Sequence, residues 1–199
     1  MRNISATLSV SMDGVIQAPG RPDEDTRDGF DRGGWAVPYN DEVMAQRMGE
    51  AMSSSGVMLF GRRTYQDFYG YWPRQTDNPF TPYLNQATKY VVSSTLSEPL
   101  PWENSILLPG DPAASVAQVK SEPGPDLGIV GSAQLVRSLF AAKLIDRYVL
   151  LIHPLVLGQG RRLFDDSGPG DNFELVDSAV TTKGVIITTY QRDADQAAN

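Results

Sequence analysis

Apolar and polar residues alternate strictly over residues 3–12, close to the start of the chain. Ile, Ala, Leu, Val and Met occupy the even positions, whereas Asn, Ser and Thr occupy the odd ones. A period of two residues predicts a β-strand, and the small polar side chains on its second face leave room for a close neighbour or a ligand. The pair Asp13-Gly14 then ends the strand in a turn.

Short apolar runs and helical periodicities follow one another along most of the remaining chain. We expect further strands over residues 57–60, 89–93, 105–108, 127–130 and 145–152. We expect helices over residues 41–54, from Gly61 onward, over residues 111–121 and after Gly131-Ser132. The first of these begins at Asn40 or Asp41, and its buried stripe at helical spacing consists of Met44, Met48, Ala51 and Met52.

This alternation of strands and helices favours an α/β fold, with a mostly parallel sheet covered by helices on both faces. Two more strands, over residues 174–177 and 185–190, have no helix between them, so we expect an antiparallel pair and a mixed sheet. Residues 17–40 are rich in Gly, Pro, Asp and Arg and predict a long loop. The length predicts one domain over residues 1–192, followed by a frayed tail over residues 193–199.

Charge and composition exclude several classes of function. A net charge of −7 repels phosphate backbones, so we expect no nucleic-acid partner. The chain has no cysteine and a single histidine, His153, which together exclude a usual zinc site, and we expect no metal. No apolar run approaches the roughly 20 residues that span a bilayer, and the N-terminus lacks a signal-peptide pattern, so we expect a cytoplasmic protein that does not enter membranes.

Two turns between a strand and a helix could bind phosphate, because helix N-termini present free N–H groups and a partial positive charge. The first is Gly61-Arg62-Arg63-Thr64, where two arginines at a helix start oppose the helix dipole unless an anion lies there. The alternative is an ordinary turn with solvated arginines. The second is Gly131-Ser132-Ala133-Gln134, and its alternative is a plain N-cap by Ser132.

Three further observations concern isolated residues and a missing motif. His153 lies before a proline at a strand end, which favours a structural role over acid–base catalysis. Trp35 lies in the polar loop and is either a core residue or a platform for a ligand. Serine hydrolase chemistry is not expected, because the chain has no G-x-S-x-G sequence.

Taken together, these residues resemble the dihydrofolate-reductase-like family that includes the reductase domain of the bifunctional riboflavin-biosynthesis deaminase-reductase. The resembling segments follow the order of the family and span nearly the whole chain. They are Ser11-Met12-Asp13-Gly14, Leu59-Phe60-Gly61-Arg62-Arg63-Thr64-Tyr65, Val91-Val92-Ser93-Ser94, Ile129-Val130-Gly131-Ser132, and Pro154-Leu155-Val156-Leu157-Gly158-Gln159-Gly160 with Leu163-Phe164.

The resemblance implies a three-layer fold with NADPH along the carboxyl edge of its sheet. By resemblance, the two turns hold the phosphates of the cofactor, the two serines flank its adenosine end, and the loop after the first strand lies beside the nicotinamide. The cofactor-binding residues implied in this way are Gly14, Val15, Gly61, Arg62, Arg63, Thr64, Ser93, Ser94, Gly131, Ser132, Ala133 and Gln134.

The sequence departs from folate reductases at the carboxylate that binds the pterin. Here that position is Ala45, and the nearest acids, Glu42 and Glu50, lie about one helical turn away. Glu42 and Trp35 are the candidate substrate-binding residues. Asp13 is the candidate catalytic acid, because a buried carboxylate after the first strand would have a raised pKa. The alternative is that Asp13 is only a turn residue, whose side chain hydrogen-bonds to its own backbone.

The function expected from the residues and the resemblance is an NADPH-dependent reductase of a pterin- or pyrimidine-like small molecule. The alternatives are a catalytically silent dinucleotide-binding module of the same fold and an unrelated α/β binding protein. We also expect a homodimer, because residues 147–152 and 154–157 offer apolar surface and members of the resembling family often pair through this sheet.

Overall fold

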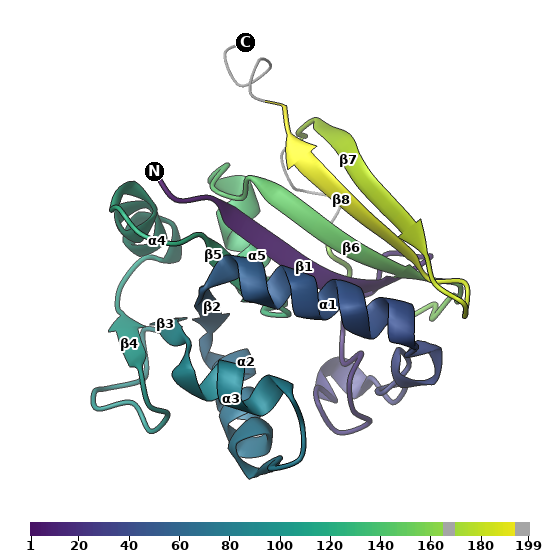
Figure 1. Cartoon of the computed structure of the whole chain (residues 1–199), viewed down its shortest axis with the longest axis horizontal. Helices are drawn as coiled ribbons and strands as arrows, with labels where there is room; N and C mark the ends of the chain where they lie inside the picture. Colours follow the sequence, from purple (N-terminus) through teal and green to yellow (C-terminus); the bar gives the residue numbers. More distant parts are fainter. Residues whose placement is uncertain (165–169, 194–199) are drawn as a thin grey trace.

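An eight-stranded sheet forms the middle layer of the computed structural model, which describes residues 1–164 and 170–193 and only the backbone of residues 52–55 (Figure 1). The strands lie side by side in the order β4-β3-β2-β5-β1-β6-β8-β7. Their bounds are β1 (Ile4–Ser11), β2 (Val57–Gly61), β3 (Thr88–Val92), β4 (Ser105–Leu108), β5 (Leu127–Val130), β6 (Arg147–His153), β7 (Phe173–Val180) and β8 (Ile186–Arg192).

The first six strands run parallel, and the last two turn back. β1 pairs in parallel with β5 and β6, and β2 pairs in parallel with β3 and β5. β8 is antiparallel to β6, and β7 is antiparallel to β8. The mixed, mostly parallel sheet that the sequence predicts is therefore confirmed.

Helices cover both faces of this sheet, which makes three layers (Figure 1). Helices α1, α2 and α3 lie on one face, and α4 and α5 lie on the other. Their bounds are α1 (Glu42–Ser55), α2 (Arg62–Tyr71), α3 (Phe80–Gln86), α4 (Pro112–Ser121) and α5 (Ala133–Ala141), with short 3-10 helices η1 (Arg27–Gly29), η2 (Val37–Tyr39) and η3 (Trp72–Arg74). None of the described helices is long and apolar enough to cross a membrane.

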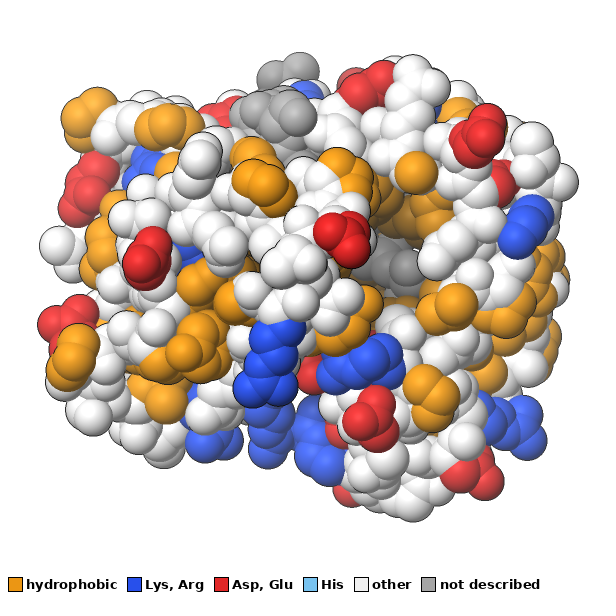
Figure 2. Space-filling view, turned by 60° about the horizontal axis from the view of Figure 1, so that its bottom comes forward, with side chains coloured by type: hydrophobic (Ala, Val, Ile, Leu, Met, Phe, Trp, Pro, Cys, Tyr) orange, Lys and Arg blue, Asp and Glu red, His pale blue; other side chains and the backbone are white. Residues whose placement is uncertain are grey.

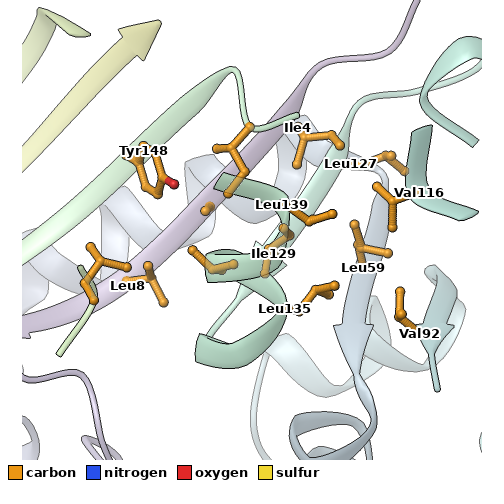
Figure 3. Packing of buried hydrophobic residues seen from close by; sticks show 14 of the residues in the cluster. Ile4, Leu8, Leu59, Val92, Val116, Leu127, Ile129, Leu135, Leu139 and Tyr148 are labelled. Carbon is orange, nitrogen blue, oxygen red and sulfur yellow. The ribbon is translucent and has the colours of Figure 1, made fainter. Parts of the chain in front are cut away.

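The alternation in β1 decides which layer each of its faces contacts. Its apolar residues pack beneath α4 and α5 with side chains such as Leu135 and Leu139 (Figure 3). Its polar face lies beneath α1, where Thr7 approaches Met48 and Ala51. Small polar residues there allow the helix to lie close to the sheet. Met12, which continues the alternation in the sequence, lies beyond the strand and is 66% exposed.

Several elements differ from the expectations. Helix α3 was not predicted, because its seven residues are too few to show a clear helical period. β6 begins at Arg147 rather than at residue 145, and the long loop contains η1 and η2. The last two strands are longer than predicted. The side chain of Met52 and residues 194–199 of the expected tail lie outside what the structure describes.

The apolar surface expected for a dimer is only partly where the sequence places it. β6 lies inside the sheet, and its Leu151 is buried against α1, so this strand is not a free surface. Val156 is exposed as expected. The larger exposed apolar area lies on β7 and β8, where Val180 and Ile186 pair across the strands and are 68% and 43% exposed.

We predict that the protein is a homodimer and that β7 contributes to its interface. Light scattering at micromolar concentration should give about twice the 21.8 kDa of one chain. Val180→Glu should shift the protein to the monomer, because a carboxylate would be desolvated in the interface. Ile106→Glu, at the exposed β4 edge, is the matched control and should remain dimeric. A wild-type mass of one chain would contradict the prediction.

Candidate functional site

The two turns singled out in the sequence meet at the carboxyl edge of the sheet. β2 and β5 are neighbouring parallel strands, so they end side by side at Gly61 and Val130. The Gly61 N–H donates to Ser132 Oγ, and the Ser132 N–H donates to Thr64 Oγ1, each over 3.1 Å. These two reciprocal hydrogen bonds join the N-termini of α2 and α5.

Neither of these helix N-termini is capped by a side chain. By contrast, Asp41 caps α1 by accepting from the Met44 N–H, and Asp111 caps α4 by accepting from the Ala114 N–H. The alternative that Ser132 is a plain N-cap is therefore wrong, because its hydroxyl accepts from the Gly61 N–H instead. Two neighbouring helix N-termini with uncapped N–H groups suit the phosphates of a dinucleotide.

The backbone at the second turn is strained in the way that functional turns often are. Gly131 has a φ of 65°, which favours glycine, and Ser132 has a φ of 52°, which is uncommon for a residue with a Cβ atom. Hydrogen bonds on both its N–H and its hydroxyl hold Ser132 in this conformation. Strain of this kind persists only where the surroundings determine it, and it is frequent at ligand-binding turns.

Arg62 and Arg63 begin α2 beside these turns, and Arg63 is exposed. No ion pair in the described part of the chain involves either arginine, whereas Arg21 and Arg161 pair with carboxylates of the loop and its neighbours. Figure 2 shows Lys and Arg side chains gathered beside a hollow that apolar side chains border. Two cations without carboxylate partners at a helix start favour an anionic ligand.

The other residues expected near the cofactor range from buried to exposed. Ser93 is buried, and its hydroxyl accepts from the Thr95 and Leu96 N–H groups, whereas Ser94 is exposed. Val15 is fully buried in the core, so only its backbone lies at the β1 turn. The remaining positions of that set, Gly14, Ala133 and Gln134, are half-buried or exposed.

Asp13 forms a hydrogen-bonded junction between β1 and the segment after β6. Its carboxylate accepts from Ser11 Oγ over 2.7 Å, from the Leu157 N–H over 3.0 Å and from the Gly158 N–H over 2.8 Å. Burial alone would raise the pKa of Asp13, but these hydrogen bonds outweigh it and lower the pKa to about 2. The expectation of a raised pKa is therefore wrong, because the carboxylate meets several donors rather than an apolar pocket.

The long loop is packed rather than disordered. Trp35 is 7% exposed in a cluster with Val15, Phe30 and Leu157, and its Nε1–H donates to the Gln17 carbonyl over 2.7 Å. The core alternative for Trp35 is therefore correct, and it offers no open platform for a substrate. Gln17, which sequence reasoning missed, also accepts from the Arg161 N–H over 3.0 Å.

His153 is fully buried at the end of β6 and supports the expected structural role. Its ring meets Trp35 and Tyr39 edge-on, and its Nδ1–H donates to the Leu151 carbonyl over 2.8 Å. Burial lowers the pKa of His153, and hydrogen bonds to backbone carbonyls only partly oppose this shift. The imidazole is therefore neutral at neutral pH. No cluster of potential metal ligands occurs among the described residues.

A cavity of about 280 Å³ opens between α1 and the α2–α3 layer. Ala45 lies in its wall, as do Asn40 and Asp41 at the start of α1. Glu42 is exposed and is not among the lining residues, so the structure does not place it at this cavity. The floor contains Met58 of β2 and Val130 of β5, the same two strands whose ends form the paired turns.

Comparison with known proteins agrees with this arrangement. The chain matches the RibD C-terminal domain family over residues 2–187. It belongs to this family. It is 27% identical to the uncharacterized protein YyaP of Bacillus subtilis (strain 168), over 95% of the chain and 94% of that protein.

Solved structures establish the fold. A pyrimidine reductase-like protein of Corynebacterium diphtheriae superposes with a TM-score of 0.64 at 14% identity, covering 98% of this chain and 93% of the other. A dihydrofolate reductase of Enterococcus faecalis, solved in complex with NADP(H), gives 0.60 at 16% identity and covers 96% of each chain. The dihydrofolate-reductase-like fold inferred from the resemblance is confirmed.

We predict that Asp13 acts through the fold and not as a general acid. Asp13→Asn should lower the free energy of unfolding by about 1–3 kcal/mol, because its single amide oxygen can replace only one carboxylate oxygen and leaves either the Leu157 or the Gly158 N–H without its acceptor. Chemical denaturation measures this, and the exposed Asp77→Asn is the control, expected within about 0.5 kcal/mol of wild type. Loss of turnover by Asp13→Asn without loss of stability would restore the catalytic role.

The stability of the protein should fall as the pH drops through the ordinary range of histidine. Below about pH 6.5 the unfolded chain binds a proton on His153 that the folded chain, with its lowered pKa, does not bind. The free energy of unfolding should therefore decrease by up to about 1.4 kcal/mol per pH unit. His153→Phe keeps the ring contacts and should remove this part of the slope. Identical slopes for the two proteins would show that His153 is not responsible.

Proposed function

We propose that this RibD C-terminal domain protein is an NADPH-dependent reductase of a small heterocyclic molecule. The observation that carries the proposal is the pair of uncapped helix N-termini held together by Ser132 and Thr64. Such a pair presents several N–H donors and two partial positive charges to one place, which suits a pyrophosphate. The NADP(H) bound by the Enterococcus faecalis dihydrofolate reductase, which has the same fold, supports this choice of dinucleotide.

The residues at the paired turns would contact different parts of the dinucleotide. Gly131 and Ser132 bring the backbone close to the pyrophosphate, while Arg62 and Arg63 meet the 2′-phosphate with charge-assisted hydrogen bonds. Ser94 is exposed at the end of β3 and flanks the adenosine end, whereas Ser93 supports the turn through its hydroxyl. Gly14 and the backbone of Val15 lie at the carboxyl end of β1, beside the nicotinamide.

The cavity between α1 and the α2–α3 layer would hold the substrate. When bound, NADPH supplies a hydride to the electron-poor carbon of a C=N or C=O group, a proton from solvent completes the reduction on the heteroatom, and NADP⁺ is left. Asp13 is ionised above about pH 2 and does not supply that proton. The apolar walls formed by Met44, Met48 and Phe68 exclude bulk water from the substrate.

A second candidate function is a dinucleotide-binding module without turnover. The observation that favours it is the cavity lining, whose only acid among the described residues is Asp41. Hydrogen bonds from the Met44 N–H and Thr182 lower the pKa of Asp41 to about 2, so it cannot donate a proton. Loss of NADPH absorbance in the presence of a pterin and pyrimidine panel distinguishes the two candidates. Oxidation of NADPH with any member of the panel favours the reductase.

We predict a preference for NADPH over NADH that depends on the two arginines of α2. Each of Arg62→Ala and Arg63→Ala should weaken NADPH binding by about 1.5–3 kcal/mol and leave NADH binding nearly unchanged, because only NADPH carries the 2′-phosphate. Calorimetric titration of both cofactors measures the effect. Arg147→Ala, which removes an exposed arginine at the other end of the sheet, is the control for net charge. Equal affinity of the wild type for both cofactors would contradict the prediction.

A further inference from the structure

The chemistry of the cavity between α1 and the α2–α3 layer restricts what the enzyme can accept. We propose that this cavity takes a molecule of one or two rings that carries no phosphate or other anionic group. This inference rests on the proposed function, because it names the substrate class of the same site. It separates the protein from a reductase that acts on a ribose-phosphate-bearing pyrimidine.

Among the described residues, the lining is apolar except for Asn40 and Asp41 at the start of α1. It contains the methionines Met44, Met48 and Met58 and the aromatic rings of Phe68, Trp72 and Phe80. Methionine side chains adapt to irregular flat ligands, and aromatic rings stack on them or meet their edges. An apolar ring would therefore bind by burial of its surface rather than by paired charges.

No lysine or arginine is among the described residues that line the cavity. Lys183, whose backbone contacts Asp41, donates its Nζ to the Pro38 carbonyl over 2.9 Å and is not part of the lining. An unpaired phosphate buried here would lose its hydration without gaining a cation. Asp41, the ionised N-cap residue of α1, lines the cavity and adds repulsion for any anion.

The one carboxylate among the described lining residues, that of Asp41, already accepts hydrogen bonds from the protein. Asp41 Oδ1 accepts from the Met44 N–H over 2.9 Å, and Oδ2 accepts from Thr182 Oγ1 over 2.7 Å. Both oxygens therefore serve the cap of α1 and its contact with the loop before β8. Ala45, on the wall one turn further along α1, has no polar side-chain atom. The lining therefore disfavours an anionic group and favours a ring that binds through its apolar surface.

The volume of the cavity is a second guide to the size of its ligand. The cavity measures about 280 Å³, whereas pockets for drug-sized ligands span about 300–1,000 Å³. One or two fused rings fit this volume, and a larger ligand would extend out of the cavity. Because Met58 and Val130 line the cavity and belong to β2 and β5, the ring would lie next to the strands that end at the cofactor turns.

The test compares three probes with the protein saturated with NADPH. Quinoline is a neutral two-ring heterocycle at neutral pH, quinaldate adds one carboxylate to it, and uridine monophosphate is a pyrimidine with a ribose phosphate. By isothermal titration calorimetry, quinoline should bind about tenfold or more tightly than either anion. Absent quinoline binding, or tighter binding of either anion, overturns the inference.

A matched pair of variants locates the binding. Ala45→Phe fills the cavity from an exposed helix position, so the fold is retained and quinoline affinity should fall by about tenfold or more. Gln46→Phe adds the same ring at the next, equally exposed position, which does not line the cavity, and should leave quinoline affinity unchanged. Equal quinoline affinity in both variants overturns the assignment to this cavity.

Titration with NADPH in the absence of probes distinguishes a failure of the proposed substrate class from a failure of the reductase proposal. Binding of NADPH together with preferred binding of an anionic probe overturns the substrate class and leaves the reductase proposal standing. Absence of NADPH binding, with quinoline still bound and sensitive to Ala45→Phe, overturns the reductase proposal and supports the ligand class of the cavity. Binding of both NADPH and quinoline, with the expected effect of Ala45→Phe, supports both.

Discussion

The reciprocal hydrogen bonds between Gly61, Ser132 and Thr64 are the constraint on which the site depends. They form because β5, although it follows β4 in the chain, inserts between β1 and β2 and ends beside β2. The N-cap residue of α2 is Gly61, which has no side chain, and the hydroxyl of Ser132 accepts from Gly61 instead of capping α5, so the first N–H groups of both helices have no side-chain cap. Packing of α5 on the apolar face of β1, β5 and β2 holds the arrangement in place (Figure 3).

A second set of contacts closes the other end of the carboxyl edge. Asp13 holds the segment after β6 through two backbone N–H groups, and Gln17 and Trp35 tie the long loop to the same segment. His153 lies between Trp35 and Tyr39 beneath that loop. Segments that are far apart in the sequence thus pack together beside the β1 turn.

The cavity and the cofactor turns are two consequences of the same strands. Met58 and Val130 face α1, α2 and α3, while their neighbours Leu59 and Ile129 face α4 and α5. Period-two alternation in β2 and β5 therefore supplies one wall of an apolar cavity and one layer of the core. The helices above the cavity present methionine and aromatic side chains rather than cations, which matches a small ligand without anionic groups better than a phosphorylated one.

The sequence by itself determined the strand–helix order, the mixed sheet, the two turns and the family resemblance, because these depend on local periodicity and on short motifs. It did not reveal α3, which is too short for a periodic signal, nor the cavity, whose walls come from residues 40 to 130. Only the tertiary structure decided that Asp13 accepts from Leu157 and Gly158, that Trp35 belongs to the core and that Glu42 faces solvent. Burial, pKa and hydrogen-bond partners arise from residues brought together by folding, and these long-range contacts have no local pattern in the chain.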